Sequence, residues 1–231
     1  MVPRHGIGRQ VEVLQMGASE PVRLALRQLW TDHIVWTRLY IIEAVDRTPI
    51  SAHLVPIAGN AIGDLATALD GAISILSGAD AAAIRLLKNQ EDIGNAIEPY
   101  YGSDAAAGLT KLLKEHILVA VNLVENAKAG DQAAFAENDR KWDDNAHAIA
   151  SFLAGANPAW PEADVWDLLK QHLELTKGEV VARIQHNWGA DVKAFDDITA
   201  EAMVIADTLY NGLAAQFPDR FGRGAMAGAA A

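Results

Sequence analysis

The chain lacks cysteine, has few basic residues and carries none of the short motifs that identify common enzyme classes. Without cysteine, disulfides, thiolate metal sites and cysteine nucleophiles are excluded. Nineteen Lys and Arg against 30 Asp and Glu give a formal net charge of -11, so no nucleic-acid partner is expected. A Gly-x-Ser-x-Gly elbow and a Gly-rich phosphate loop are also missing, which argues against serine hydrolases and nucleotide-binding folds.

What is present is typical of helices. Apolar residues, 51% of the chain, recur at three- and four-residue spacings, and Pro or Gly separates the periodic segments. These breaks predict helices at 20–46, 60–76, 80–98, 104–128, 131–154, 162–186 and 188–216. The fold class is therefore predicted to be all-α: a helical bundle of about six to seven helices made of three antiparallel hairpins.

The sequence predicts one bundle domain over residues 20–221. A flexible arm is expected at 1–19 and a disordered, Gly- and Ala-rich tail at 222–231. The first residues lack the apolar segment of a secretory signal, so a cytoplasmic location is expected.

Three segments of similar sequence, 29–34, 112–117 and 168–173, each read Leu, apolar, polar, polar, His, aliphatic. The helix that follows each carries a second similarity: Asn89-x-x-Asp92, Trp142-x-x-Asn145 and Trp188-x-x-Asp191. This order predicts three repeated hairpins, each with a His on its first helix and an Asp or Asn on its second.

Each of these histidines shares a helix face with a core leucine four residues earlier, so each requires a hydrogen-bond partner or a metal. In one interpretation the histidines are structural and bond to Asp92, Asn145 and Asp191. In the other they bind a divalent metal (Zn, Fe or Mn) or a small polar ligand. The candidate metal ligands are His33, His116, His172, Glu179, Asp92 and Asp191. No Glu-x-x-His pair occurs, which counts against a ferritin-like di-iron site.

Other polar residues lie near the histidines in the helical register. Arg38 and Arg183 are expected to pair with carboxylates at the rim of the bundle or to hold an anion. Thr37 and Thr176, each four residues after a histidine, are expected to bond to a backbone carbonyl or to line the same cavity. The six tryptophans are expected mainly as core anchors.

Residues 48–78 form an apolar insertion in the first hairpin. Asp64 and Asp70 within it argue against a transmembrane helix, because a central Asp costs about 2.5–3.5 kcal/mol on insertion scales. We expect a packed helical excursion that could mediate a homo-oligomer. Contact with a membrane surface is the weaker alternative.

An ordered series of motifs between residues 24 and 221 resembles a family of bacterial helical proteins with no established activity. The motifs include Leu29-Trp30-x-x-His33, Pro99-x-Tyr101-Gly102, Trp142-x-x-Asn145, His172-Leu173-x-Leu175-Thr176-x-x-Glu179 and Gln216-Phe217-Pro218. Some members are labelled acetylglutamate kinase. Kinases of that type resemble α/β sandwiches with phosphate loops, and nothing here matches them.

The sequence is compatible with three hypotheses about function. The leading one is binding of a metal ion or small polar ligand by inward His and carboxylate side chains. The alternative is a non-catalytic structural or oligomerisation module in which the histidines satisfy the core. An enzyme acting on a small molecule at the same site is a third hypothesis, for which spacing assigns no acid–base pair.

Overall fold

The computed structural model describes residues 20–46 and 78–221, and every regular element in these two ranges is a helix. The helices are α1 (Glu20–Asp46), α4 (Gly78–Ala96), α5 (Glu98–Tyr101), α6 (Ser103–Ala129), α7 (Gln132–Ala156), α8 (Glu162–Ile184), α9 (Trp188–Gln216) and α10 (Pro218–Phe221). The all-α class expected from the sequence is confirmed. The predicted arm, the tail and the insertion up to residue 77 lie outside the described residues.

Local sequence explains where the helices begin and end. Asp131 caps α7, since its side chain accepts a hydrogen bond from the Ala134 amide. The side chain of Asn187 caps α9 in the same way by accepting from the Ala190 amide. Gly130 ends α6 in the left-handed conformation, with φ of 71°.

The predicted helix over 80–98 corresponds to α4, and the predicted break before residue 104 contains one additional short helix. Helix α4 ends at Ala96, and the short α5 begins at Glu98 with Pro99 in its first turn. Proline has no amide hydrogen and disfavours helical geometry in the residue before it, so it ends one helix and starts the next.

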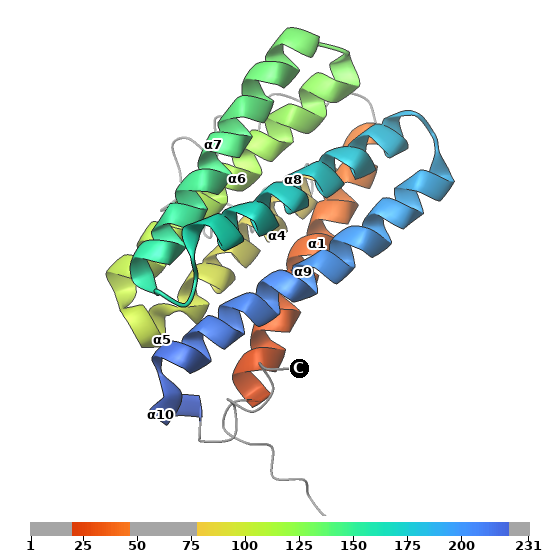
Figure 1. Ribbon diagram of the computed structural model, residues 1–231. Coiled ribbons are helices and arrows are strands. Elements are labelled where there is room, and N and C mark those ends of the chain that lie inside the picture. The colour runs from red at the N-terminus through yellow and green to blue at the C-terminus, as the bar shows by residue number, and fades with distance from the viewer. Residues whose placement is uncertain (1–19, 47–77, 222–231) are drawn as a thin grey trace, which may run out of the picture.

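The six long helices form three hairpins arranged in a closed ring (Figure 1). The hairpins are α1–α4, α6–α7 and α8–α9, and neighbouring hairpins meet through α4 with α6, α7 with α8, and α9 with α1. The first helices of the hairpins, α1, α6 and α8, also contact one another. These three helices therefore lie nearest the bundle axis, and they are the ones that carry the histidines.

Two clusters of buried apolar side chains form the core within the ring, and the larger one contains three of the tryptophans. Trp30, Trp142 and Trp160 are buried in it, as expected for core anchors, whereas Trp188 is half-exposed at the start of α9. Among the described helices, none combines the length and the apolar character needed to cross a membrane.

Candidate functional site

The three inner helices bring His33, His116 and His172 together near the bundle axis. The ring centroids of His33 and His172 lie 5.5 Å apart, and those of His116 and His172 lie 6.4 Å apart. All three side chains are buried. The indole of Trp30 contacts the rings of His33 and His172, and that of Trp142 contacts the ring of His116. We call the space that these three histidines line the histidine chamber.

The Nδ1 atom of each histidine bonds to a side chain on the second helix of its own hairpin. The pairs are His33 with Gln90 Nε2 at 3.1 Å, His116 with Asn145 Oδ1 at 2.9 Å, and His172 with Glu201 Oε2 at 3.1 Å. The predicted pairing of His116 with Asn145 is confirmed. The predicted pairings of His33 with Asp92 and of His172 with Asp191 are wrong.

Helix geometry explains both errors. Asp92 follows Gln90 by two residues, which turns it by roughly 200° around α4, and it bonds instead to Lys88 at 3.0 Å. Asp191 precedes Glu201 by ten residues, which places it roughly 15 Å farther along α9. The similarity of Trp188-x-x-Asp191 to Trp142-x-x-Asn145 therefore does not mark equivalent positions.

The partner of His33 determines where its proton lies. The Gln90 amide nitrogen is close to the Leu86 carbonyl oxygen at 3.0 Å and to Asn89 Oδ1 at 3.1 Å, so it must be a donor. Asn89 is itself oriented by its own bond to the Leu29 carbonyl. His33 Nδ1 therefore accepts, and the neutral ring carries its hydrogen on Nε2.

The partner of His116 gives this ring the opposite tautomer. The Asn145 amide nitrogen donates to the Leu112 carbonyl at 3.1 Å, so Asn145 Oδ1 faces the histidine and accepts from Nδ1–H. The neutral His116 ring then has an unprotonated Nε2. His172 takes the same form when Glu201 is ionised, because a carboxylate can only accept.

Burial keeps the first two of these rings neutral. Desolvation, together with the neighbouring His172 and His116, lowers the pKa of His33 well below its ordinary value. Desolvation and His172 lower the pKa of His116 to about 3, against a smaller opposing effect of the Asn145 bond. At neutral pH, therefore, the His33 ring carries its hydrogen on Nε2, whereas the His116 ring has a lone pair on Nε2.

The chamber contains a cavity of about 30 Å³. Thr37 and Thr176 also line it, and each hydroxyl donates to the carbonyl of the histidine four residues earlier at 2.8 Å. These threonines therefore both bond to a backbone carbonyl and line the cavity, the two roles expected for them. Two further lining residues, Tyr40 and Trp142, carry a buried Oη and a buried Nε1 for which the described residues provide no hydrogen-bond partner. Burial raises the pKa of Tyr40, so its hydroxyl stays protonated and available as a donor.

Glu179 and Asp191 lie in a separate ion-pair cluster that links α1, α8 and α9. Arg38 donates to Glu179 Oε1 at 2.7 Å and to both oxygens of Asp191, and Arg183 bonds to Asp191 at 3.2 Å and to Asp46. Both arginines thus pair with carboxylates, which was one of the two roles expected for them.

The two carboxylates of this cluster respond differently to their surroundings. Burial raises the pKa of Glu179, and the bond from Arg38 only partly offsets it. Burial also opposes ionisation of Asp191, but the bonds from Arg38 and Arg183 outweigh it and hold the pKa of Asp191 below its ordinary value.

The six predicted metal ligands are therefore distributed over three places. The three histidines meet in the chamber, Glu179 and Asp191 bind arginines, and Asp92 pairs with lysine on the outer side of α4. Within residues 20–46 and 78–221, no group of three or more His, Asp or Glu side chains has an arrangement that could hold a metal ion.

Sequence reasoning missed Gln90, Glu201 and Tyr40. One signal could have found Glu201: it follows His172 by 29 residues, the same interval that separates His116 from Asn145. No comparable signal marks Gln90, because the insertion changes the interval in the first hairpin to 57 residues.

In comparisons with known proteins, no family model, curated protein or solved structure matches the chain.

Proposed function

We propose that the histidine chamber binds one small, neutral, polar molecule of about the size of water. The observation that carries this proposal is the convergence of three buried imidazoles on a cavity of about 30 Å³. Tyr40 and Trp142 also line this cavity, and their buried Oη and Nε1 have no hydrogen-bond partner among the described residues. A buried water needs a cavity of at least about 10–15 Å³ and two to four polar partners. The cavity is large enough for a water, whereas an organic substrate of ordinary size exceeds the space. The polar partners in this proposal are the three imidazoles, together with Tyr40 and Trp142.

The donors and acceptors of the chamber favour a ligand that has both functions. His33 offers Nε2–H, and His116 offers an unprotonated Nε2, as their partners Gln90 and Asn145 require. Tyr40 Oη supplies a further buried polar contact. A molecule with at least one donor and one acceptor satisfies these groups together, and it removes the penalty of leaving them unpaired.

A divalent metal ion is a poorer complement to the same groups. A ligating histidine must present an unprotonated nitrogen to the ion and donates its other N–H to a neighbour. His116 has this arrangement with Asn145, but His33 has the reverse, since Gln90 donates to its Nδ1. Metal binding by all three rings would require the Gln90 amide to be reoriented against its bonds to Leu86 and Asn89.

A non-catalytic structural role is the second candidate. It is favoured by the fact that each Nδ1 is already bonded within its own hairpin, so the histidines join the inner and outer helices. In that account the three hairpins are equivalent units whose histidines need no further ligand. The two accounts differ in whether the chamber is occupied.

Cross-relaxation between solvent water and the histidine ring protons, measured by NMR, distinguishes them. Water is the probe, and a long-lived bound water gives a contact to the rings of the chamber. The filling variant is Ala120→Val: Ala120 lines the cavity four residues after His116, and the two added methyl groups occupy the space. The matched control is Ala148→Val, the same change at an exposed position of α7.

We expect the water contact in the native protein and in Ala148→Val, and its loss in Ala120→Val. A native protein without any water contact to the rings would contradict the proposal, and so would a folded Ala120→Val that retains it. Titration with zinc chloride adds an independent criterion. Stoichiometric binding at micromolar or lower Kd would replace the neutral ligand with a metal ion.

A further inference from the structure

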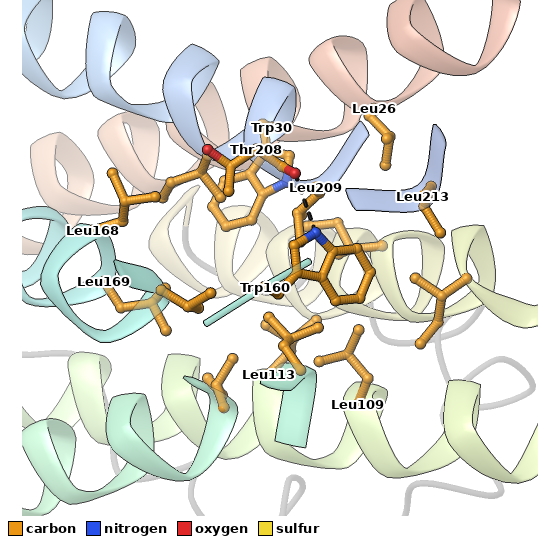
Figure 2. A pocket seen from close by; sticks show the side chains of 16 residues that line it. Leu26, Trp30, Leu109, Leu113, Trp160, Leu168, Leu169, Thr208, Leu209 and Leu213 are labelled. Atoms are coloured by element: carbon orange, nitrogen blue, oxygen red, sulfur yellow. Dashed lines mark hydrogen bonds between the residues drawn. The ribbon is translucent and has the colours of Figure 1, made fainter. Parts of the chain in front are cut away.

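A second internal cavity, shown in Figure 2, shares a neighbour, Trp30, with the histidine chamber. Its volume is about 40 Å³, and side chains from α1, α4, α6, α7, α8 and α9 line it together with Trp160. Trp30 belongs to its wall and also contacts the rings of His33 and His172. This tryptophan therefore stands between two cavities whose walls differ in chemistry.

The wall of this second cavity is almost wholly apolar. Of its 16 lining residues, 15 are Leu, Ile, Val or Trp, and the remaining one is Thr208. The Thr208 carbonyl accepts a hydrogen bond of 3.1 Å from Trp160 Nε1, drawn as the dashed line in Figure 2. Trp30 Nε1 has no hydrogen-bond partner among residues 20–46 and 78–221, but a single donor falls short of the two to four polar partners that a buried water needs.

The position of Trp160 maintains the open space. This residue precedes α8, is fully buried, and packs against Gly212 of α9. A Cβ atom at position 212 would lie 1.8 Å from Trp160 Nε1, so only glycine leaves room for the indole. Its hydrogen bond to Thr208 holds the ring in that position, where Trp160 is part of the cavity wall.

We propose that this cavity is a binding site for a small, neutral, apolar molecule of the size of xenon or dioxygen. Close-packed interiors contain few voids larger than a water molecule, and the atoms that line a dry void lack dispersion contacts on one side. An apolar occupant restores those contacts without needing a hydrogen bond. Cavities of about 150 Å³ accept benzene, so a volume of about 40 Å³ selects for much smaller molecules.

Xenon is the probe, applied to crystals under pressure and, in solution, through the chemical shift of ¹²⁹Xe. The filling variant is Val165→Ile, which adds one methylene at a buried wall position of α8. The matched control is Val204→Ile, the same change at an exposed position of α9. Benzene serves as the size control.

We expect one xenon atom within the wall of Figure 2, with affinity at least tenfold lower in Val165→Ile and unchanged in Val204→Ile. Benzene should not bind. Absence of xenon from this cavity in the native protein would overturn the proposal, and the native measurement decides this even where a variant folds poorly. Equal xenon affinity in the two folded variants would also overturn it, as would ordered water in the cavity of unpressurised crystals. The water-contact experiment on the histidine chamber tests the proposed function independently of these results.

Discussion

At the scale of single residues, the chamber depends on amides that direct the histidine protons. Gln90 and Asn145 both contact a histidine Nδ1, but one presents nitrogen and the other oxygen, because each amide is held by further bonds. The two rings consequently differ in tautomer although they occupy similar positions on their helices. The hydrogen-bond chemistry of the cavity is therefore set by residues outside it.

Replacing Gln90 with glutamate should reverse the tautomer of His33. A carboxylate at this position accepts rather than donates, so the proton moves from Nε2 to Nδ1. Long-range ¹⁵N–¹H correlation spectra of the histidine rings report the change directly. We expect Gln90→Glu to convert His33 to the Nδ1–H form of His116, while Asp92→Asn, on the outer side of α4, leaves it as it is. An unchanged His33 spectrum in a folded Gln90→Glu would refute the role given to Gln90.

The buried histidines should also make stability depend on pH. Because the pKa values of His33 and His116 are lowered in the folded state, the unfolded chain binds these protons first as the pH falls. The stability contributed by their neutral forms is complete above the unfolded pKa of about 6.5 and is lost progressively below it. The slope approaches about 1.4 kcal/mol per pH unit for each histidine.

Urea unfolding at pH 7.5, 6.5, 5.5 and 4.5 measures this dependence. We expect the free energy of unfolding to change little between the first two values and to fall steeply below pH 6.5. A free energy of unfolding that stays constant between pH 6.5 and 5 would show that the two rings are not buried in neutral form.

Sequence could predict the chamber at this scale only in part. The position of His33, His116 and His172 on apolar helix faces was sufficient to predict that they point inward, and their meeting in one place was left open. Their partners were harder, because a polar residue two positions away on the same helix faces the opposite side. Glu201 was hidden for another reason: its neighbours do not resemble those of Asn145, and only the shared interval of 29 residues connects them.

At the scale of helices, the bundle is held together by more than apolar packing. The cluster of Arg38, Glu179, Asp191 and Arg183 joins α1, α8 and α9 on one side of the chamber. Arg23 and Arg27 of α1 both bind Asp207 of α9 nearer the other end of the same helix pair. The two clusters differ in burial, and we expect their contributions to differ accordingly.

Substitution of Arg38 by methionine should destabilise the protein strongly. It leaves Glu179 and Asp191 buried without their main partner, and removal of one member of a buried pair costs about 3–5 kcal/mol. The control is Arg23→Met: its side chain is 39% exposed and Arg27 still binds Asp207, so a loss below about 1 kcal/mol is expected. Chemical denaturation of both variants measures the difference, and equal losses would refute the assigned burial.

The helices themselves were the most predictable feature. Asp131 and Asn187 are strong capping residues, and the structure begins α7 and α9 directly after them. The break after residue 98 was predicted, but the short helix α5 within it was missed, because proline interrupts a helix and is also tolerated in the first turn of a new one. The contacts between hairpins could not be predicted from local sequence, because they depend on how all six long helices close into one ring.

At the scale of the whole molecule, the ring of three hairpins encloses two cavities whose lining side chains differ in polarity. One cavity near the axis is apolar and is bounded by Trp160, and the next is lined by the three histidines, with Trp30 between them. A ring in which α1, α6 and α8 all face inward provides such an axis, which a single hairpin lacks. We infer that the arrangement of hairpins positions the chamber, and that the amides of the outer helices give it its polarity.

The measurement that tests this account most directly is a crystal structure at a resolution that shows individual ordered solvent molecules. We expect the rings of His33, His116 and His172 to enclose one ordered peak within hydrogen-bonding distance of the Nε2 atoms of His33 and His116. The Nδ1 atoms should remain bonded to Gln90, Asn145 and Glu201. Rings that pack directly against one another with no density between them, or that turn Nε2 away from the chamber, would contradict the central claim.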